Sequence, residues 1–174
     1  MTTPFPDEWT VRRALEAYLE ENGFTVAAYD AKWTDASFFG IPFKVPNTAR
    51  HRSAIMLHDL HHVATGFGTD LVGEGEISAW ELRGGMQRLG LYVGAIVLAG
   101  ALAGAMLAPR RAWQAWRRAD GARSLFELVS VHDDAAYTEL LELRVADLRA
   151  RIGIPASGIA TAPRRHHHFA PRAL

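Results

Sequence analysis

The sequence contains no cysteine, and this absence excludes several kinds of chemistry. Disulfide bonds, thiolate ligands to a metal and a cysteine nucleophile all require a residue that the 174-residue chain lacks. Lysine is almost as scarce, because Lys32 and Lys44 are the two lysines and arginine supplies the other basic residues. Any metal site in this chain must therefore use nitrogen and oxygen ligands.

Net charge is also absent, because 19 basic residues balance 19 acidic ones. A protein that binds nucleic acid usually carries a basic excess, so this balance predicts no nucleic-acid partner. The segment Met1 to Trp9 is acidic and lacks the apolar region of a signal peptide. We therefore expect a cytoplasmic protein.

No convincing strand alternation is present, whereas helix caps and helix stops are clear. We predict an all-α, single-domain bundle of about six helices over residues 1–154, which is long enough to bury a core. Residues 155–174 are rich in Pro, Ala, Gly and Arg and include three adjacent histidines, and we expect a disordered tail there.

The motif His58-Asp59-Leu60-His61-His62 is the most informative stretch of the chain. In a helix over residues 53–65, capped by Asn47 or Thr48 upstream, each residue advances by about 100°. His58 and His62 then stack on one face, Asp59 lies at the edge of that arc, and His61 flanks it.

Glu74 follows this motif after a loop that three glycines interrupt, and such a loop can turn the chain back sharply. Two imidazoles and two carboxylates at one point would suit a divalent metal: zinc or iron for the nitrogens, with manganese or magnesium possible through the carboxylates. The plainer interpretation is a hydrogen-bonded core histidine and a solvated acid in the first turn of the next helix, expected over residues 77–88. Glu76 is a second candidate carboxylate. The motif also superficially resembles the His-Asp phosphohydrolase signature, but the upstream His51 lies too close for that family.

Residues 89–108 contain no charged side chain, and their length is typical of a membrane-spanning helix. Glycine and alanine dilute the hydrophobicity, and the Gly100-x-x-x-Gly104 spacing lets a helix or a ligand approach closely. Three interpretations remain open: a buried or pocket-lining helix, an interfacial helix and a spanning helix.

Arginine and tryptophan alternate directly after this segment, at Arg110, Arg111, Trp113 and Trp116. Indole rings at headgroup depth and arginines on anionic lipid are typical of a membrane-surface anchor. An equally good interpretation is a solvated helix that buries its two indoles against the core. Base stacking on a nucleic acid is poorer, because the basic patch is small.

The motif resembles that of the coenzyme Q biosynthesis protein 4 family, in which H-D-x-x-H is followed after eleven residues by Glu. His58, Asp59, His62 and Glu74 reproduce this spacing without a gap. The resemblance covers roughly residues 42–154, although the amino-terminal part matches poorly. Further residues that match the family strengthen the resemblance: Thr65-Gly66, Gly73-Glu74, Trp80, Leu148-Arg149 and Ile152-Gly153-Ile154.

The resemblance implies that His58, Asp59, His62 and Glu74 hold a divalent zinc or iron ion, with Asp59 either a ligand or a group that orients a histidine. It implies a metal-dependent carboxy-lyase or oxidative decarboxylase of ubiquinone biosynthesis, which removes the C1 carboxyl of a prenylated ring in a step coupled to hydroxylation there. His61 would be a proton carrier.

The resemblance further implies a lipid-binding protein, peripheral on the inner (plasma) membrane, that works beside other ubiquinone-biosynthesis enzymes. The prenyl tail of the quinone precursor would lie in an apolar groove that includes Leu91, Val93, Ile96 and Leu102. The alternative is a non-catalytic scaffold, in which the metal is structural and its coordination is closed. A third possibility is a related fold that serves another isoprenoid or acyl ligand.

Overall fold

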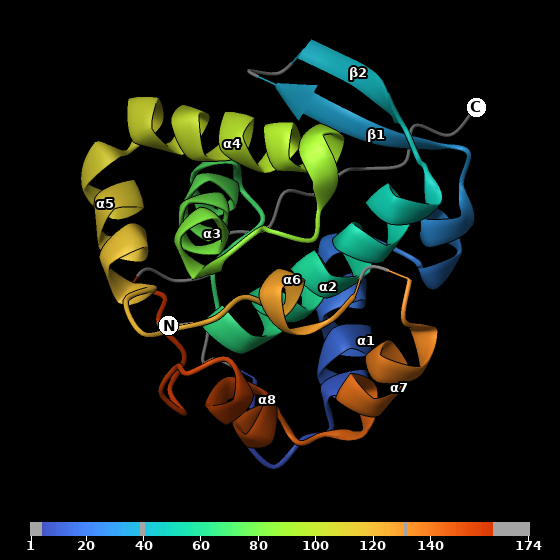
Figure 1. Ribbon diagram of the computed structural model, residues 1–174, viewed down its shortest axis with the longest axis vertical. Helices are drawn as coiled ribbons and strands as arrows, with labels where there is room; N and C mark the ends of the chain where they lie inside the picture. The colour runs from blue at the N-terminus through green and yellow to red at the C-terminus, as the bar shows by residue number, and fades with distance from the viewer. Residues whose placement is uncertain (1–4, 39–40, 131, 162–174) are drawn as a thin grey trace.

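Helices make up most of the computed structural model, which describes residues 5–38, 41–130 and 132–161 (Figure 1). The all-α class is confirmed, but this part of the chain holds eight α-helices rather than six, together with one 3-10 helix and one hairpin. The elements in chain order are α1 (Val11–Asn22), η1 (Val26–Asp30), β1 (Trp33–Phe38), β2 (Ile41–Pro46), α2 (Ala49–Thr65), α3 (Leu71–Gly84), α4 (Gly90–Leu107), α5 (Pro109–Arg118), α6 (Leu125–Leu128), α7 (Asp134–Glu142) and α8 (Val145–Arg151).

The hairpin of β1 and β2 stands where no regular element was expected. Its strands are antiparallel, with Trp33 opposite Pro46 and Phe38 opposite Ile41. Proline cannot donate to a ladder, so Pro42 and Pro46 argued against a strand. In a two-stranded sheet, however, both strands are edges, and a proline there costs no inner hydrogen bond.

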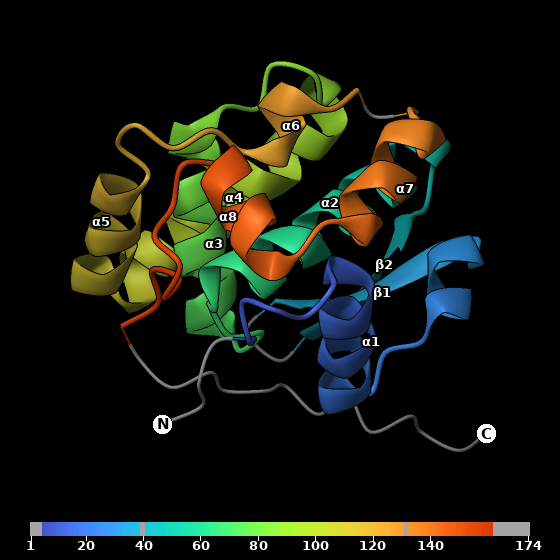
Figure 2. The same cartoon turned by 90° about the horizontal axis from the view of Figure 1, so that it is seen from below.

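Helix α2 runs through the middle of the fold and contacts α1, α3, α6 and α8. The view from below shows it beside α8 (Figure 2). Thr48 caps its start, where the hydroxyl accepts a hydrogen bond from the backbone N–H of His51. Gly66 ends it in the left-handed conformation, with φ of 83°. The predicted motif helix and its cap are thus confirmed, with the start four residues earlier than expected.

Helix α3 packs mainly on α4 and α5, on the side of the molecule away from α1 and α7 (Figure 1). It begins at Leu71 rather than near residue 77, because the side chain of Asp70 accepts a hydrogen bond from Gly73 N–H and caps the helix. The turn before it is very tight, since a Cβ on Gly73 would lie 2.2 Å from the carbonyl oxygen of Gly68. Glu74 therefore lies in the first turn of a helix, not in a loop.

Two separate helices, α7 and α8, lie between residues 134 and 151. Between them the backbone of Leu143 accepts a hydrogen bond from Val11 N–H at 2.8 Å, and Val145 N–H donates to the carbonyl of Trp9 at 2.9 Å. Backbone groups used in this way cannot also join a continuous helical ladder. A short bridge to the start of α1 therefore separates α7 from α8.

The packed chain extends beyond Ile154, so the predicted boundary of the disordered tail lies too early in the chain. The backbone N–H groups of Ile159 and Ala160 donate to the carbonyl of Thr65 at 2.9 and 3.1 Å, next to the end of α2. Ile159 is buried against the core. The expected tail from residue 162 onward lies outside the described residues.

Candidate metal centre

Two consecutive turns of α2 and the first turn of α3 bring three predicted ligands together. His58 and His62 lie on one face of α2, and the tight turn after Gly66 places Glu74 opposite them. The Nε2 atoms of the two histidines are 3.1 Å apart. Glu74 presents Oε2 at 3.2 Å from His58 Nε2 and Oε1 at 3.4 Å from His62 Nε2. These three residues form one group that could hold a metal ion.

The hydrogen bonds behind the two rings decide which nitrogen faces this group. His62 Nδ1 lies 3.1 Å from the carbonyl oxygen of Phe67, which can only accept, so the ring carries its proton at Nδ1. His58 Nδ1 donates to Oε1 of Glu81 at 2.7 Å. The Nε2 atoms of both rings therefore face Glu74, and each can present a lone pair to a metal when its ring is neutral, as metal-ligating histidines require.

A second possible metal group, His58 with His61 and Glu81, has geometry close enough to hold an ion. Its hydrogen bonds favour another role. His61 Nε2 accepts from the backbone N–H of Leu125 at 2.8 Å, so a neutral His61 carries its proton at Nδ1 and donates it to Glu81 at 2.7 Å. The ring has no lone pair left for a metal. Of the two groups, that of His58, His62 and Glu74 therefore has the ring nitrogens that are better placed to hold a metal ion.

His61, predicted to carry protons, is completely buried, and both of its ring nitrogens are engaged within the protein. Burial lowers its pKa despite the nearby carboxylate of Glu81, which acts in the opposite direction. A ring held neutral, without access to solvent, is better suited to support its neighbours than to exchange protons.

Asp59 is not brought together with the other three predicted ligands. Its Oδ1 accepts a hydrogen bond from Tyr18 Oη at 3.1 Å, and its Oδ2 accepts a short hydrogen bond from Tyr29 Oη. Burial raises the pKa of Asp59, partly offset by these hydrogen bonds and by the two histidines. The ring of Tyr18 in turn stacks on His62, with centroids 5.4 Å apart. Asp59 is therefore connected to the predicted ligand His62 through the ring of Tyr18.

The ionisable groups of the cluster shift one another's pKa values. Burial alone would raise the pKa of Glu74, but the adjacent His62 and His58 outweigh it and hold that pKa well below the usual range. In the same way His58 and His61 hold the pKa of Glu81 at about 2. Burial would lower the pKa of His58, and the carboxylates of Glu81 and Glu74 raise it well above its ordinary value instead. Without a metal, the ring of His58, which lies between the carboxylates of Glu74 and Glu81, therefore favours its charged form.

The group is open on one side. The side chains of His58 and Glu74 are 23% and 39% exposed, whereas His62 is buried. Two imidazole nitrogens and one carboxylate, with a face left toward solvent, match the donor set of non-haem iron and of catalytic zinc sites. The residues present therefore fit a transition-metal ion.

Sequence reasoning missed Glu81 and the two tyrosines. Glu81 follows Glu74 by seven residues, which is two helical turns, so the signal was available once α3 was known to begin at Leu71. Tyr18 and Tyr29 come from α1 and η1 and carry no local signal. Glu76, the second candidate carboxylate, lies apart from the cluster and pairs with Arg111.

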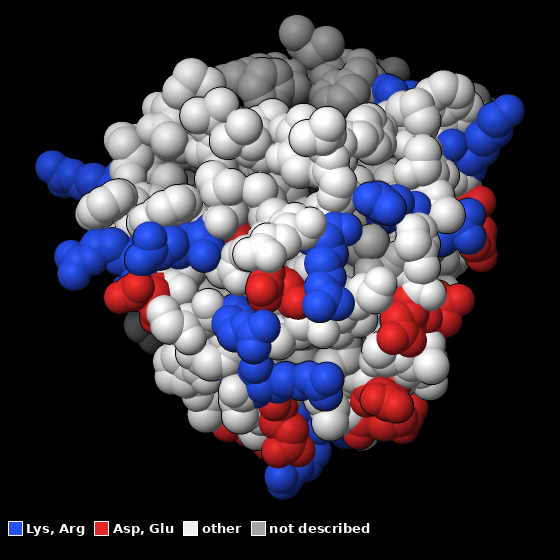
Figure 3. Space-filling model, viewed as in Figure 1, with Lys and Arg blue, Asp and Glu red and all other residues white. Residues whose placement is uncertain are grey.

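The four predicted lipid-binding residues do not line one common surface. Val93 is on the buried face of α4, whereas Leu91, Ile96 and Leu102 are exposed. Figure 3 shows the same view as Figure 1, in which α4 crosses the upper part of the molecule. The surface there is largely free of charged side chains, and basic side chains lie below it and at its side. Within the described chain, α4 is the one helix long and apolar enough to cross a membrane, judged by length and composition.

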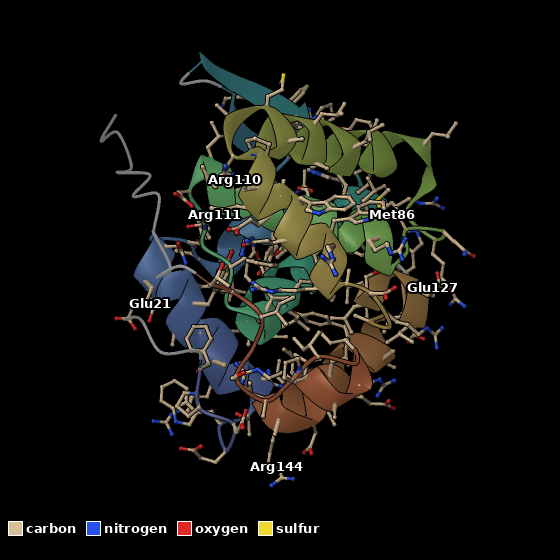
Figure 4. All side chains as sticks on the ribbon, turned by 90° about the vertical axis from the view of Figure 1, so that its left-hand side faces the viewer. Glu21, Met86, Arg110, Arg111, Glu127 and Arg144 are labelled. Carbon is tan, nitrogen blue, oxygen red and sulfur yellow. The ribbon has the colours of Figure 1, made fainter. Side chains whose placement is uncertain are left out.

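The predicted membrane-surface residues have different surroundings. Arg110 and Trp113 are exposed, and Figure 4 shows Arg110 and Arg111 near the start of α5. Arg111 forms an ion pair with the buried carboxylate of Glu76. Trp116 is partly covered, with the guanidinium of Arg83 lying 5.4 Å from its ring centroid. Arg110 and Trp113 are therefore free to face a membrane, whereas Arg111 and Trp116 contact other residues of the fold.

No protein-family model, curated protein or solved structure matches this chain. The resemblance to the coenzyme Q biosynthesis protein 4 family thus stays a prediction that rests on the motif and its spacing.

Proposed function

We propose that this chain binds one divalent transition-metal ion through His58, His62 and Glu74 and acts on a prenylated aromatic quinone precursor. The C1 carboxyl would leave as carbon dioxide and a hydroxyl would take its place on that carbon, a two-electron oxidation for which molecular oxygen would be the oxidant. The observation that supports this proposal is the convergence of two Nε2 atoms and one carboxylate within 3.1 to 3.4 Å of one another. The motif resemblance supplies the reaction and the substrate class.

The roles of the protein groups follow from their contacts. His58, His62 and Glu74 would hold the ion, the Phe67 carbonyl would keep His62 in its required tautomer, and Glu81 would do the same for His58. Bound there, a zinc or iron ion supplies a Lewis acid for the carboxylated head group or, if it is iron, a centre for oxygen activation.

The exposure of the site favours an enzyme over a scaffold. A structural metal is enclosed by four protein ligands, whereas a catalytic one keeps an open position. Here the described residues bring three ligands together, and His58 and Glu74 are partly exposed. A substrate group could therefore occupy the remaining position.

The location of α4 supports an amphiphilic substrate and a peripheral membrane location on the inner membrane. A Cβ on Gly100 would lie 4.0 Å from the backbone oxygen of Glu74, so α4 passes directly beside a predicted ligand. Its outer face exposes Leu91, Leu102 and Met106. A prenyl tail could rest on this apolar surface, which is on the side of α4 opposite to the one that faces Glu74, and the same surface would rest on lipid.

Metal analysis is the first test. The parent protein carries His166→Gln, His167→Gln and His168→Gln, so that these three histidines contribute no metal, and it is compared with the same protein carrying His58→Ala and His62→Ala. We expect about one equivalent of iron or zinc in the parent and none in the variant. A carboxylated prenyl-phenol should then release carbon dioxide only with the parent. Absence of metal from both proteins would refute the proposal.

The exposed apolar face of α4 also favours the second candidate, a lipid-binding scaffold that presents the precursor to other ubiquinone-biosynthesis enzymes. That candidate predicts one tightly held zinc, co-purifying prenyl lipid and no turnover. Release of carbon dioxide by the parent protein would exclude it.

A further inference from the structure

Glu81 occupies an unusual position for a buried carboxylate. It has no exposed surface, and its Oε1 lies 2.7 Å from Nδ1 of His58 and 2.7 Å from Nδ1 of His61. Its Oε2 has no hydrogen-bond partner among the described residues. The hydrogen bonding of this side chain is therefore devoted to two imidazole rings, one of which faces the metal centre.

His61 links this carboxylate to a distant backbone group. Because Leu125 N–H donates to its Nε2 at 2.8 Å, the ring is fixed with its proton at Nδ1, pointing at Glu81. The ring is also enclosed by Trp80 and Phe126, with centroids at 5.1 and 4.9 Å. His61 thus connects Glu81 to the first turn of α6 and prevents the carboxylate from turning away from His58.

We infer that Glu81 is a positioning residue: it holds His58 with its Nε2 directed at the metal, and His61 holds Glu81 in place from the backbone of Leu125. This inference rests on the proposed metal centre. A carboxylate behind a ligating histidine fixes the ring orientation and makes the ring a stronger donor, and loss of such a group typically costs about tenfold to hundredfold in metal affinity.

The matched control is Glu76, a second buried carboxylate on the same helix. Glu76 pairs with Arg111 and does not contact the cluster. The variants Glu81→Gln and Glu76→Gln make the same chemical change, loss of one buried negative charge, at positions less than two turns apart. A role in general stability would affect both, whereas a positioning role would affect the metal only in Glu81→Gln.

The experiment measures zinc affinity of the full-length chain, with the three terminal histidines replaced as above, by competition with a chelator. We expect Glu81→Gln to bind one equivalent with an affinity about 10-fold to 100-fold lower. Glu76→Gln should bind within about twofold of the parent, because its contacts lie outside the cluster. Thermal unfolding of both metal-free variants reports their stability separately.

Imidazole nitrogen NMR on the zinc-loaded parent tests the same inference without any substitution at the site. We expect His58, His61 and His62 all to carry the proton at Nδ1. A proton on Nε2 of His58 or His61 would overturn the inference, as would equal zinc affinity in the parent and Glu81→Gln. If the parent binds no zinc or iron at all, the proposed function fails. If the parent binds zinc and Glu81→Gln binds it equally well, the positioning inference fails alone.

Discussion

Gly75 of α3 and Gly104 of α4 lie so close that a Cβ atom on Gly75 would be 2.3 Å from the Cα atom of Gly104. The two helices therefore meet backbone to backbone at the residue that follows Glu74. Any side chain at this crossing must push α4 away from α3 or displace the first turn of α3. The candidate ligand Glu74 and the apolar helix are thus mechanically connected.

Gly104→Ala should destabilise the protein by about 1–3 kcal/mol, because the added methyl group overpacks this crossing. The Cβ would lie 2.6 Å from Cα of Gly75 and displace Glu74 next to it, so zinc affinity should fall as well. Chemical denaturation and chelator competition measure the two effects.

Gly94→Ala on the same helix is the control for this prediction. A Cβ there meets nothing within 4 Å, and alanine is a better helix former than glycine by about 0.5–1 kcal/mol. We expect Gly94→Ala to stabilise the protein slightly. A loss of stability in both variants would show that α4 tolerates no added methyl group and that the crossing is not special.

Asp59→Asn should leave one equivalent of metal in the protein. Asparagine keeps the size of the side chain but can accept at one atom only, so one of the two hydroxyl donors, from Tyr18 or Tyr29, would lose its partner. We expect a loss of about 1–3 kcal/mol in the free energy of unfolding. Elemental analysis of the folded variant is decisive, because complete loss of metal would make Asp59 a direct ligand.

Arg149→Leu should cost about 3–5 kcal/mol, because it removes a buried charge and leaves the groups that it binds without that donor. The guanidinium donates to the carbonyls of Ala64 and Ala156 at 3.0 and 2.7 Å and pairs with Asp7. These contacts tie the chain start, the end of α2 and the segment after α8 together.

Arg144 provides the comparison for this prediction, because its ion pair with Asp147 is exposed on the surface. Arg144→Leu should change the free energy of unfolding by less than about 1 kcal/mol. Urea unfolding of both variants gives the difference, and similar costs would contradict the role assigned to Arg149.

Leu102→Ser combined with Met106→Ser should weaken binding to vesicles of anionic and zwitterionic lipid by about tenfold or more. The two side chains are 56% and 67% exposed on α4, so each would bury apolar surface in the bilayer, at about 25 cal/mol per Å². Val26→Ser, at an equally exposed position on η1, should leave binding unchanged. Vesicle co-sedimentation measures both, and unchanged binding of the double variant would remove α4 from the membrane surface.

The ligand trio is the part of the site that could be predicted from the sequence. The placement of His58 and His62 follows from helical periodicity alone, and the glycines and Asp70 after them turn the chain within a few residues. Such features depend on neighbours along the chain, so local rules are sufficient. The all-α class was predictable for the same reason, since caps and stops are local signals.

The hairpin and the break between α7 and α8 could not be predicted in this way. β1 and β2 carry two prolines that argue against strands, and only their pairing as two edges makes them compatible. The break between α7 and α8 exists because Leu143 and Val145 bond to Trp9 and Val11, more than 100 residues away along the chain. A sequence pattern around Leu143 and Val145 cannot indicate hydrogen-bond partners that lie so far away along the chain.

The sequence by itself determined which residues can meet as ligands, because a helical turn places His58 over His62 and a short turn returns Glu74 to them. The tertiary structure decided what the neighbouring ionisable groups do. Asp59 is directed to two tyrosines, and His61 is fixed by the backbone of Leu125. A histidine ring or a carboxylate takes its role from the donors and acceptors around it, and here those come from segments that only packing brings together.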